Sequence, residues 1–237
     1  MATIAHGRVF QRQESADPAL LIDLNRSCVP NVADAMHGMG VVEGLSRVGS
    51  LHSQVVGSAV TVDVTPGDGL MARAALAQCV VGDILVINAH GNLDRVVLGG
   101  SVCIAAKAIG VVAILVDGSV RDIEEIELIG LPVFARNVTP RSGTTDCGWG
   151  EVNVPVAIGG VVVMPGDAIM ASLEGCLVIP RRDLASVIGS VREVEERKGR
   201  PEDLNNRIEV AGATVPGLER ALTAMADRGI TISQGPY

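Results

Sequence analysis

Apolar positions recur along the chain with two different periods, which predict strands and helices in alternation. Residues 53–65 alternate in the manner of a strand, and residues 82–89 and 111–117 are apolar runs of strand length. Between those two runs lies "LGGSVCIAAKAIG" (98–110), whose small residues and closing glycine predict a helix packed closely on a sheet. The order strand, helix, strand predicts a β-α-β unit with the carboxyl ends of its strands at one edge of the sheet.

The flanking segments add helices at both ends and strands in the second half. Residues 131–180 are apolar runs separated by Gly, Pro and Asp turns, which is typical of strands. No low-complexity linker interrupts the chain, so we expect a single α/β domain over residues 1–237, with helical extensions at about 17–40 and 181–237. The further helical segments are expected at residues 17–28, 31–39, 66–78, 121–130, 181–198 and 217–229.

Composition narrows the classes of function. The formal net charge is -8 and the basic residues are scattered, so we expect no direct nucleic-acid binding. No apolar run approaches the ~20 uncharged residues of a membrane helix, and the first residues lack the apolar segment of a signal peptide, so we expect no membrane contact and a cytoplasmic location. The cysteines are widely spaced without a CxxC pair, which predicts buried thiols in a reducing compartment: Cys28, Cys79, Cys103, Cys147 and Cys176.

Arg121 and Asp122 are the first candidates for chemistry, because they follow the apolar run 111–117 in the hexapeptide "DGSVRD". A guanidinium beside a carboxylate suits a substrate that carries a carboxylate or a 2-oxo acid, with Mg²⁺ or Mn²⁺ on the Asp polarising the carbonyl. The alternative is structural: the two residues begin the helix 121–130, where acidic residues complement the helix dipole. On residue types alone the structural interpretation is the more common one.

Gly99 and Gly100 are the second candidates, at the start of the predicted helix 98–110. Glycines there let a carboxylate approach the free N–H groups of the helix start, although close packing of the helix on the sheet explains them equally well. In a β-α-β unit the start of the helix and the end of the following strand face the same side. We therefore expect these glycines and Arg121–Asp122 to share one crevice.

Three segments, in order and spacing, resemble one protein family. The segments are "PGDGLMARAALAQCVVGDILVINAHG" (66–91), "LGGSVCIAAKAIGVVAILVDGSVRD" (98–122) and "EVNVPVAIGGVVVMPGD" (151–167). They resemble the RraA-like family, which contains the regulator of ribonuclease activity A and the class II 4-hydroxy-4-methyl-2-oxoglutarate / 4-carboxy-4-hydroxy-2-oxoadipate aldolases. The resemblance covers roughly residues 30 to 198.

The resemblance implies a layered α/β/β/α swivelling-domain fold, assembled as a homotrimer or as a dimer of trimers (a homohexamer) with sites between subunits. In the aldolases the Arg of the Arg-Asp pair binds the 2-oxo acid and the Asp holds a divalent metal, Mg²⁺ or Mn²⁺, largely through waters. Carried over, the catalytic residues are Arg121 and Asp122, and Asp122 is the metal ligand. The backbone amides that would receive the pyruvate carboxylate fall on Gly99, Gly100, Ser101 and Val102.

One departure from the aldolase pattern bears on activity. The aldolases carry an acidic residue twenty-one positions before the Arg, where it helps to hold a metal water, and this chain has Gly100 there. Loss of that carboxylate could weaken metal affinity or shift the substrate. A Glu that a neighbouring subunit contributes from its C-terminal helix has its counterpart in Glu195 or Glu196.

These features lead to a first hypothesis and two alternatives. The first is a divalent-metal-dependent lyase that cleaves a 4-hydroxy-2-oxo diacid to pyruvate, decarboxylates oxaloacetate, or does both. The second is a non-catalytic protein-binding regulator that resembles the ribonuclease regulator branch. That branch tends to lose the carboxylate next to the Arg, whereas this chain keeps Asp122. The third is a family scaffold with a different or lost activity, which Gly100 keeps open.

Overall fold

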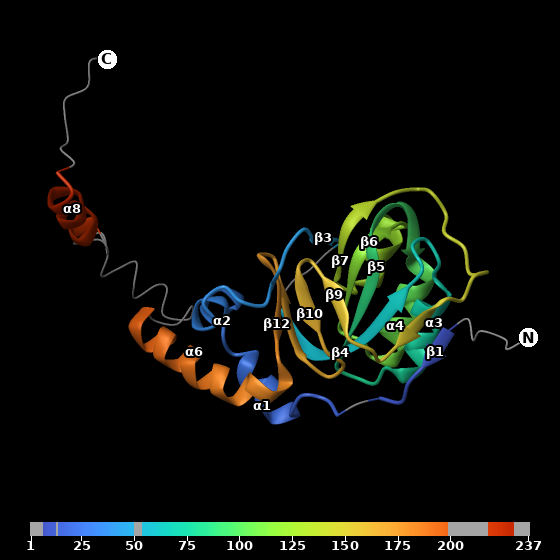
Figure 1. Ribbon diagram of the computed structural model, residues 1–237, viewed down its shortest axis with the longest axis horizontal. Helices are drawn as coiled ribbons and strands as arrows, with labels where there is room; N and C mark the ends of the chain where they lie inside the picture. Colours follow the sequence, from blue (N-terminus) through green and yellow to red (C-terminus); the bar gives the residue numbers. More distant parts are fainter. Residues whose placement is uncertain (1–6, 13, 50–53, 199–217, 230–237) are drawn as a thin grey trace, which may run out of the picture. The chain divides into compact units, whose positions relative to one another are not determined.

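The computed structural model describes residues 7–12, 14–49, 54–198 and 218–229 (Figure 1). The chain separates into two compact units, residues 1–194 and residues 195–237. The second unit contains the end of helix α6 (Leu184–Lys198) and helix α8 (Leu218–Asp227). The expected helices at 181–198 and 217–229 are therefore present, whereas residues 199–217 and 230–237 of the expected C-terminal extension lie outside the described residues.

A ten-stranded sheet forms the centre of the first unit, and four neighbouring strands in it run parallel to one another. In order across the sheet they are β4 (Val55–Val64), β5 (Asp83–Leu98), β6 (Ala113–Val120) and β7 (Val133–Val138). The connections between them carry α3 (Leu70–Ala75) with a 3-10 turn at Leu76–Gln78, α4 (Gly100–Ile109) and α5 (Ile123–Ile129). The predicted β-α-β unit of β5, α4 and β6 is confirmed.

The other strands extend this sheet or pack on it. Antiparallel strands β11, β12 and β2 continue the sheet beyond β4, β3 pairs with β7, β8 pairs with β4 and β1, and β9 and β10 form a separate hairpin. Their bounds are β1 (Gly7–Val9), β2 (Val41–Val42), β3 (Ser46–Val48), β8 (Gly150–Val152), β9 (Val156–Ile158), β10 (Val161–Val163), β11 (Ala168–Ser172) and β12 (Gly175–Ile179). Helices α1 (Pro18–Leu24), α2 (Val29–Ala35) and α6 pack on one face of β11 and β12.

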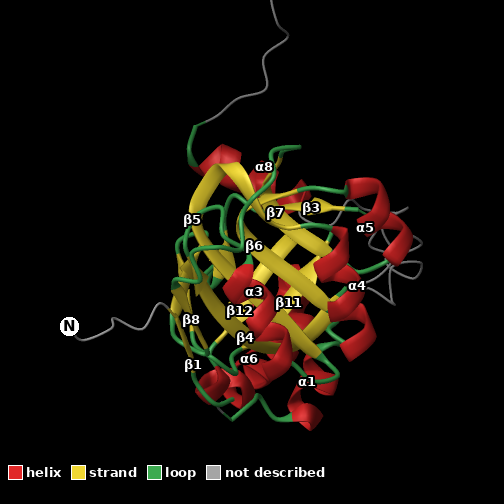
Figure 2. Ribbon diagram, turned by 90° about the vertical axis from the view of Figure 1, so that its right-hand side faces the viewer, coloured by secondary structure: helices red, strands yellow, loops and turns green. Residues whose placement is uncertain are grey.

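Side chains that alternate along each strand build three apolar layers. Leu85 and Ile87 of β5 pack with α3, α4 and α5, whereas Ile84 and Val86 pack with β9 and β10 on the opposite face. Residues of β11 and β12 alternate in the same way between the hairpin and helices α1, α2 and α6. Figure 2 shows α3 and α4 in front of the strands. The predicted layered α/β/β/α fold is confirmed.

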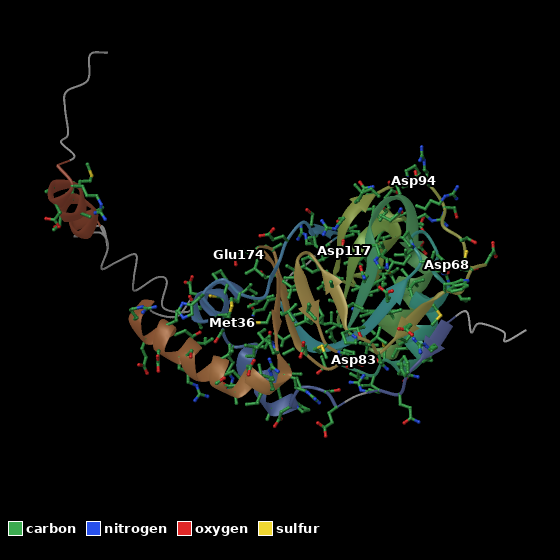
Figure 3. All side chains as sticks on the ribbon, in the orientation of Figure 1. Met36, Asp68, Asp83, Asp94, Asp117 and Glu174 are labelled. Atoms are coloured by element: carbon green, nitrogen blue, oxygen red, sulfur yellow. The ribbon has the colours of Figure 1, made fainter. Side chains whose placement is uncertain are left out.

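Buried carboxylates tie distant segments to the sheet. Asp117 lies inside β6 and binds Arg136 of β7 and the backbone N–H of Gly159, in the turn between β9 and β10 (Figure 3). Asp83 binds Arg12 with both oxygens, which holds the N-terminal segment against the start of β5. Since both carboxylates are almost fully buried, each is paired with an arginine, as burial of a charge requires.

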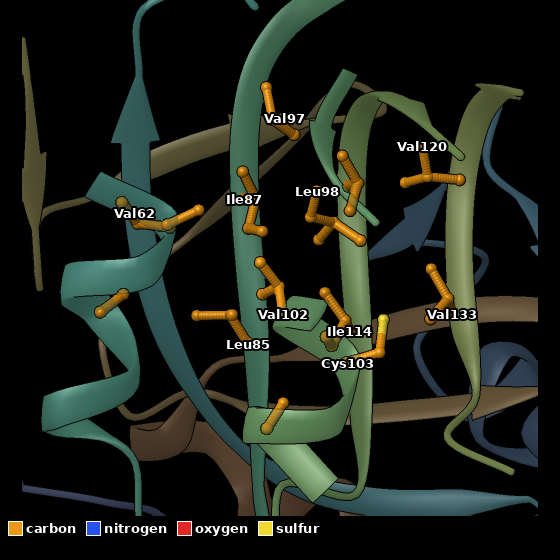
Figure 4. Packing of buried hydrophobic residues seen from close by; sticks show 14 of the residues in the cluster. Val62, Leu85, Ile87, Val97, Leu98, Val102, Cys103, Ile114, Val120 and Val133 are labelled. Atoms are coloured by element: carbon orange, nitrogen blue, oxygen red, sulfur yellow. The ribbon is translucent and has the colours of Figure 1, made fainter. Parts of the chain in front are cut away.

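Helix α4 packs with its small residues against the sheet. Val102, Cys103 and Ala106 are buried and face β5 and β6, where Figure 4 places Val102 and Cys103 beside Leu85 and Ile114. Gly110 ends the helix with φ 99°, a left-handed conformation that favours glycine. The close approach explains why the segment is rich in small residues, and it fixes the start of α4 relative to the ends of the strands.

Several predicted boundaries were wrong, and the reasons are physical. Strand β6 continues three residues past Asp117, because the polar side chains of Asp117 and Ser119 have long-range partners that satisfy them inside the sheet. Strand β5 continues to Leu98 through His90 and Gly91, both at positive φ, with shifts of register. Helices α1 and α2 are shorter than expected. None of the helices among the described residues is long and apolar enough to cross a membrane.

Candidate active site

Arg121 and Asp122 follow the last residue of β6 directly, at the carboxyl edge of the parallel strands. Asp122 adopts φ 62° and ψ 45°, a left-handed conformation that is uncommon outside glycine. Its side chain does not cap α5, which begins at the next residue. The carboxylate instead accepts a hydrogen bond from the backbone N–H of Gly100 at 3.1 Å. The structure therefore brings the start of α4 and the end of β6 together, as the β-α-β pattern predicts.

Arg121 lies against the same helix start. Its Nε is 3.5 Å from Oδ2 of Asp122, and both side chains are 38% exposed. A Cβ built at Gly99 would overlap the Asp122 carboxylate and lie 3.2 Å from Cγ of Arg121. Glycine at position 99 is thus required for the Arg121–Asp122 pair to approach α4 this closely.

The space beside Gly100 is filled by a carboxylate from another helix. Gly100 has no left-handed φ, so its backbone would accept a side chain. A Cβ built there would overlap Oε2 and Cδ of Glu125, which belongs to α5. The place in which an acidic side chain at position 100 would begin therefore contains the carboxylate of Glu125. Glu125 was not among the residues that the sequence singled out.

A polar cleft of about 300 Å³ opens at this edge of the sheet. Gly99, Ser101, Arg121 and Asp122 line one part of it, and Arg73 of α3 lines another. The end of β5 and a loop before β8 complete the wall, through Val96, Val97, Leu98, Ser142, Gly143, Thr144, Thr145 and Asp146. The cleft is a suitable size for a small polar ligand, at the lower end of the range for ligand sites.

Asp68 holds the loop that forms this wall. Asp68 is 1% exposed (Figure 3), and its carboxylate accepts hydrogen bonds from the backbone N–H groups of Leu70 and Cys147 at 2.8 Å and of Gly148 at 3.3 Å. Thr144 pairs with the turn before α3, where its N–H donates to the carbonyl of Gly67. The buried carboxylate of Asp68 thus joins the loop to the start of α3, and the backbone pairing of Thr144 adds a second link.

The remaining predicted residues differ in their exposure and in their hydrogen bonds. Ser101 is exposed and lines the cleft, whereas Val102 is buried and its N–H donates to the carbonyl of Gly99. The N–H of Gly100 is likewise occupied by Asp122. Glu195 and Glu196 lie on the last turns of α6, in the second compact unit.

Cys103 is a fully buried thiol on α4, the helix whose start contacts Asp122. Burial raises its pKa to about 12, and the negative charges of Glu125 and Asp122 act in the same direction. The thiol is therefore protonated near neutral pH and is neither a nucleophile nor a metal ligand there.

The donor set fits a divalent cation that retains most of its waters. Among the described residues, no three His, Cys, Asp or Glu side chains are grouped so that they could hold a metal ion. Asp122 and Glu125 nevertheless present carboxylate oxygens at the start of α4, and Mg²⁺ is often bound through one or two carboxylates together with water and substrate oxygens. Asp122 is thus the first candidate ligand, and Glu125 is the second.

Sequence reasoning missed Arg73, Asp68 and Glu125, each for an identifiable reason. Arg73 is the one charged residue in the apolar segment "GLMARAALAQ" (69–78), which is a usable signal. Asp68 stands in a turn tripeptide, Pro-Gly-Asp, that usually means only a turn. Glu125 is one of several acidic residues on a short helix, and only the fold shows that it reaches Gly100.

Comparison with known proteins agrees with this architecture. The model of the family described as RraA-like: Aldolase/RraA matches residues 29–178. A protein of Halalkalibacterium halodurans, whose name assigns it provisionally as a 4-hydroxy-4-methyl-2-oxoglutarate aldolase, is 33% identical over 162 residues, which cover 68% of this chain and 77% of that protein. The 4-hydroxy-4-methyl-2-oxoglutarate aldolase of Thermus thermophilus is 33% identical over 113 residues, 48% of this chain and 68% of that enzyme.

A solved structure from the other branch of the family is also similar. The crystal structure of RraAS2 from Streptomyces coelicolor, described as an unusual member of the RNase ES inhibitor RraA protein family, has a TM-score of 0.67 and 27% sequence identity. The match covers 78% of this chain and 96% of that one. Family model, relatives and fold thus agree, and the chain belongs to the Aldolase/RraA family.

Proposed function

We propose that the protein is a divalent-metal-dependent lyase that releases pyruvate from a 2-oxo acid. The substrate would be a 4-hydroxy-2-oxo diacid, cleaved in a retro-aldol reaction, or oxaloacetate, which loses carbon dioxide. The observation that carries the proposal is the Arg121–Asp122 pair held against the start of α4 at a polar cleft. The aldolase names of the relatives support the same class of reaction.

Both reactions pass through the enolate of pyruvate, so one arrangement of charge serves both. As the bond between C3 and C4 breaks, negative charge develops on the 2-oxo oxygen. The guanidinium of Arg121 lies at the cleft and would stabilise this charge while it binds the carboxylate or the 2-oxo oxygen through its planar fork. A divalent cation held by Asp122, with Glu125 beside it, would supply Lewis-acid polarisation of the same oxygen.

The glycine start of α4 would position the carboxylate of the substrate. Gly99 and Ser101 line the cleft, and no side chain at Gly99 blocks the backbone there. Because the N–H groups of Gly100 and Val102 are already bonded, the amides of Gly99 and Ser101 are the better candidates of the four. We further propose that the enzyme works as a trimer or a dimer of trimers, with Glu195 or Glu196 completing the site of a neighbouring subunit.

The direct test is a coupled assay of pyruvate release from oxaloacetate and from 4-hydroxy-4-methyl-2-oxoglutarate, with and without Mg²⁺ or Mn²⁺. We expect metal-dependent turnover of at least one substrate above the rate without enzyme, and its loss in Asp122→Asn. Asp94→Asn is the matched control, because Asp94 is an exposed carboxylate that pairs with Arg141, and neither residue lines the cleft. Absence of metal-dependent turnover with both substrates would contradict the lyase and favour the protein-binding alternative.

A further inference from the structure

Arg73 supplies a second guanidinium at the cleft, from a segment of the chain far from Arg121. It belongs to α3, the helix that connects β4 to β5, whereas Arg121 follows β6. Both arginines line the same cleft, together with Gly99, Ser101 and Asp122. The Arg121–Asp122 pair therefore accounts for only one of the two cationic groups that a ligand would meet.

The fold directs the Arg73 side chain toward the end of β5. Its Nη1 donates to the carbonyl of Gly69 at 3.2 Å, at the start of its own helix. A Cβ built at Gly69 would lie 2.8 Å from this Nη1 and would overlap the carbonyl oxygen of Val97, which also lines the cleft. Glycine at position 69 thus leaves room for the guanidinium beside β5, where Figure 4 shows Val97.

Within the part of the chain that the structure describes, no acidic side chain balances the charge of Arg73. Arg12, Arg136 and Arg141 each bind a carboxylate, and Arg121 has Asp122 beside it. Among the residues that the structure describes, no carboxylate forms an ion pair with Arg73. Asp146 lines the same cleft, but its carboxylate accepts the hydroxyl of Thr144 in its own loop at 2.6 Å. Arg73 therefore keeps most of its N–H donors for a ligand.

We propose that Arg73 binds the second carboxylate of a dicarboxylic 2-oxo acid whose 2-oxo end is held at Arg121. This inference rests on the proposed function, because it assumes that a 2-oxo acid binds at Arg121. Two guanidinium groups at one small cleft recognise a dianion better than a monoanion, since each binds a carboxylate through a planar fork. Arg73 is then the residue that selects dicarboxylates, while Arg121 holds the 2-oxo end, and the C3–C4 bond that breaks lies between the two groups.

The test compares the binding of two unreactive 2-oxo acids that differ in the second carboxylate. 2-Oxoglutarate carries it and 2-oxobutyrate does not, and both are titrated calorimetrically into the Mg²⁺-loaded protein. We expect the wild type to bind 2-oxoglutarate more tightly than 2-oxobutyrate. Arg73→Gln should lower the affinity for 2-oxoglutarate by roughly tenfold or more and leave the affinity for 2-oxobutyrate unchanged. Arg73→Lys should keep part of the preference, because it keeps the charge without the fork.

Arg26→Gln is the matched control, since Arg26 is exposed, pairs with Asp23 on α1, and does not line the cleft. The proposal is overturned if Arg73→Gln lowers the affinity for both ligands equally or for neither of them. It is also overturned if the wild type binds neither ligand. It also predicts a raised KM with nearly unchanged kcat for a dicarboxylic substrate. If Asp122→Asn turns over as fast as the wild type, the proposed function fails, and the binding preference still decides the role of Arg73.

Discussion

At the scale of single residues, Gly100 and Glu125 compete for one place at the start of α4. Because a side chain at Gly100 would overlap the Glu125 carboxylate, only one of the two positions can place an acidic group there. Glycine at position 100 therefore does not leave the site without a second carboxylate. We infer that Glu125 contributes to cation binding beside Asp122.

We expect Glu125→Gln to lower the affinity for Mn²⁺ by roughly tenfold, the lower end of what loss of a supporting group costs a metal site. Isothermal titration of Mn²⁺ measures this without turnover. The double variant Gly100→Asp with Glu125→Ser should recover most of the affinity, because it moves the carboxylate to the other helix. Glu124→Gln, a neutralised exposed residue of the same helix, is the control. If both Gln variants lower the Mn²⁺ affinity equally, Glu125 contributes only its negative charge and is not a specific part of the cation site.

Gly99 and Gly189 give a second matched pair. A Cβ at Gly99 would overlap the Asp122 carboxylate, whereas one at Gly189, inside α6, meets no atom within 4 Å. Gly99→Ala should therefore displace Asp122 and lower kcat/KM by at least tenfold, a loss that corresponds to about 1.4 kcal/mol. Gly189→Ala should keep activity and raise the free energy of unfolding by about 0.5–1 kcal/mol, because alanine restricts the unfolded chain and favours the helix. Pyruvate release and urea unfolding measure the two effects.

The residues that sequence reasoning found and missed differ in how local their signal is. Arg121 and Asp122 are neighbours in the sequence, and the β-α-β pattern alone predicts their position opposite Gly99. Arg73 and Glu125 reach the same place from other helices, and their roles depend on side-chain directions that no local pattern contains. Prediction from the sequence therefore gave the centre of the candidate site and left out part of its surroundings.

At the scale of elements, the loop 142–148 depends on the carboxylate of Asp68. We expect Asp68→Asn to destabilise the protein by about 1–3 kcal/mol, because an amide NH₂ would face the N–H groups that the buried carboxylate now accepts. Hydrogen exchange should accelerate at Cys147 and Gly148 before it does in β5 or β6. Asp17→Asn, at the exposed N-cap of α1, should change neither, since asparagine caps a helix equally well. Unchanged exchange in the loop would show that other contacts hold it.

Strand β6 shows why element boundaries were harder to predict than elements. The segment "DGSV" looks like a turn, because Asp, Gly and Ser favour turns. In the sheet, however, the Asp117 carboxylate accepts hydrogen bonds from Arg136 and from the N–H of Gly159, and the Ser119 hydroxyl accepts one from Asn137. The strand therefore continues to Val120. These partners come from residues nineteen to forty-two positions away in the case of Asp117. The position of Arg121 at the cleft follows directly from this extension.

At the scale of the whole molecule, the layered fold was predictable because several independent signals agree. The apolar alternation in β5, β11 and β12 sorts side chains to two faces, and the three family segments lie in the expected order. The assembly of subunits has no such signal within one chain. The resemblance implies sites between subunits, with Glu195 or Glu196 supplied by a neighbour, and this arrangement can be tested by mixing subunits.

Two variants that are each inactive should regain activity together if the site is shared. Asp122→Asn removes the cation ligand, and the double variant Glu195→Gln, Glu196→Gln removes the carboxylates supplied to the neighbour. After subunit exchange, a site is intact only where a subunit of the second variant adjoins one of the first, which random mixing gives for about a quarter of the sites in a closed ring. We therefore expect the mixture to reach up to about a quarter of wild-type pyruvate release. If activity does not return although subunit exchange is proven, the glutamates act within their own subunit or have no role at the site. If the double variant is itself active, the two glutamates are not needed for catalysis.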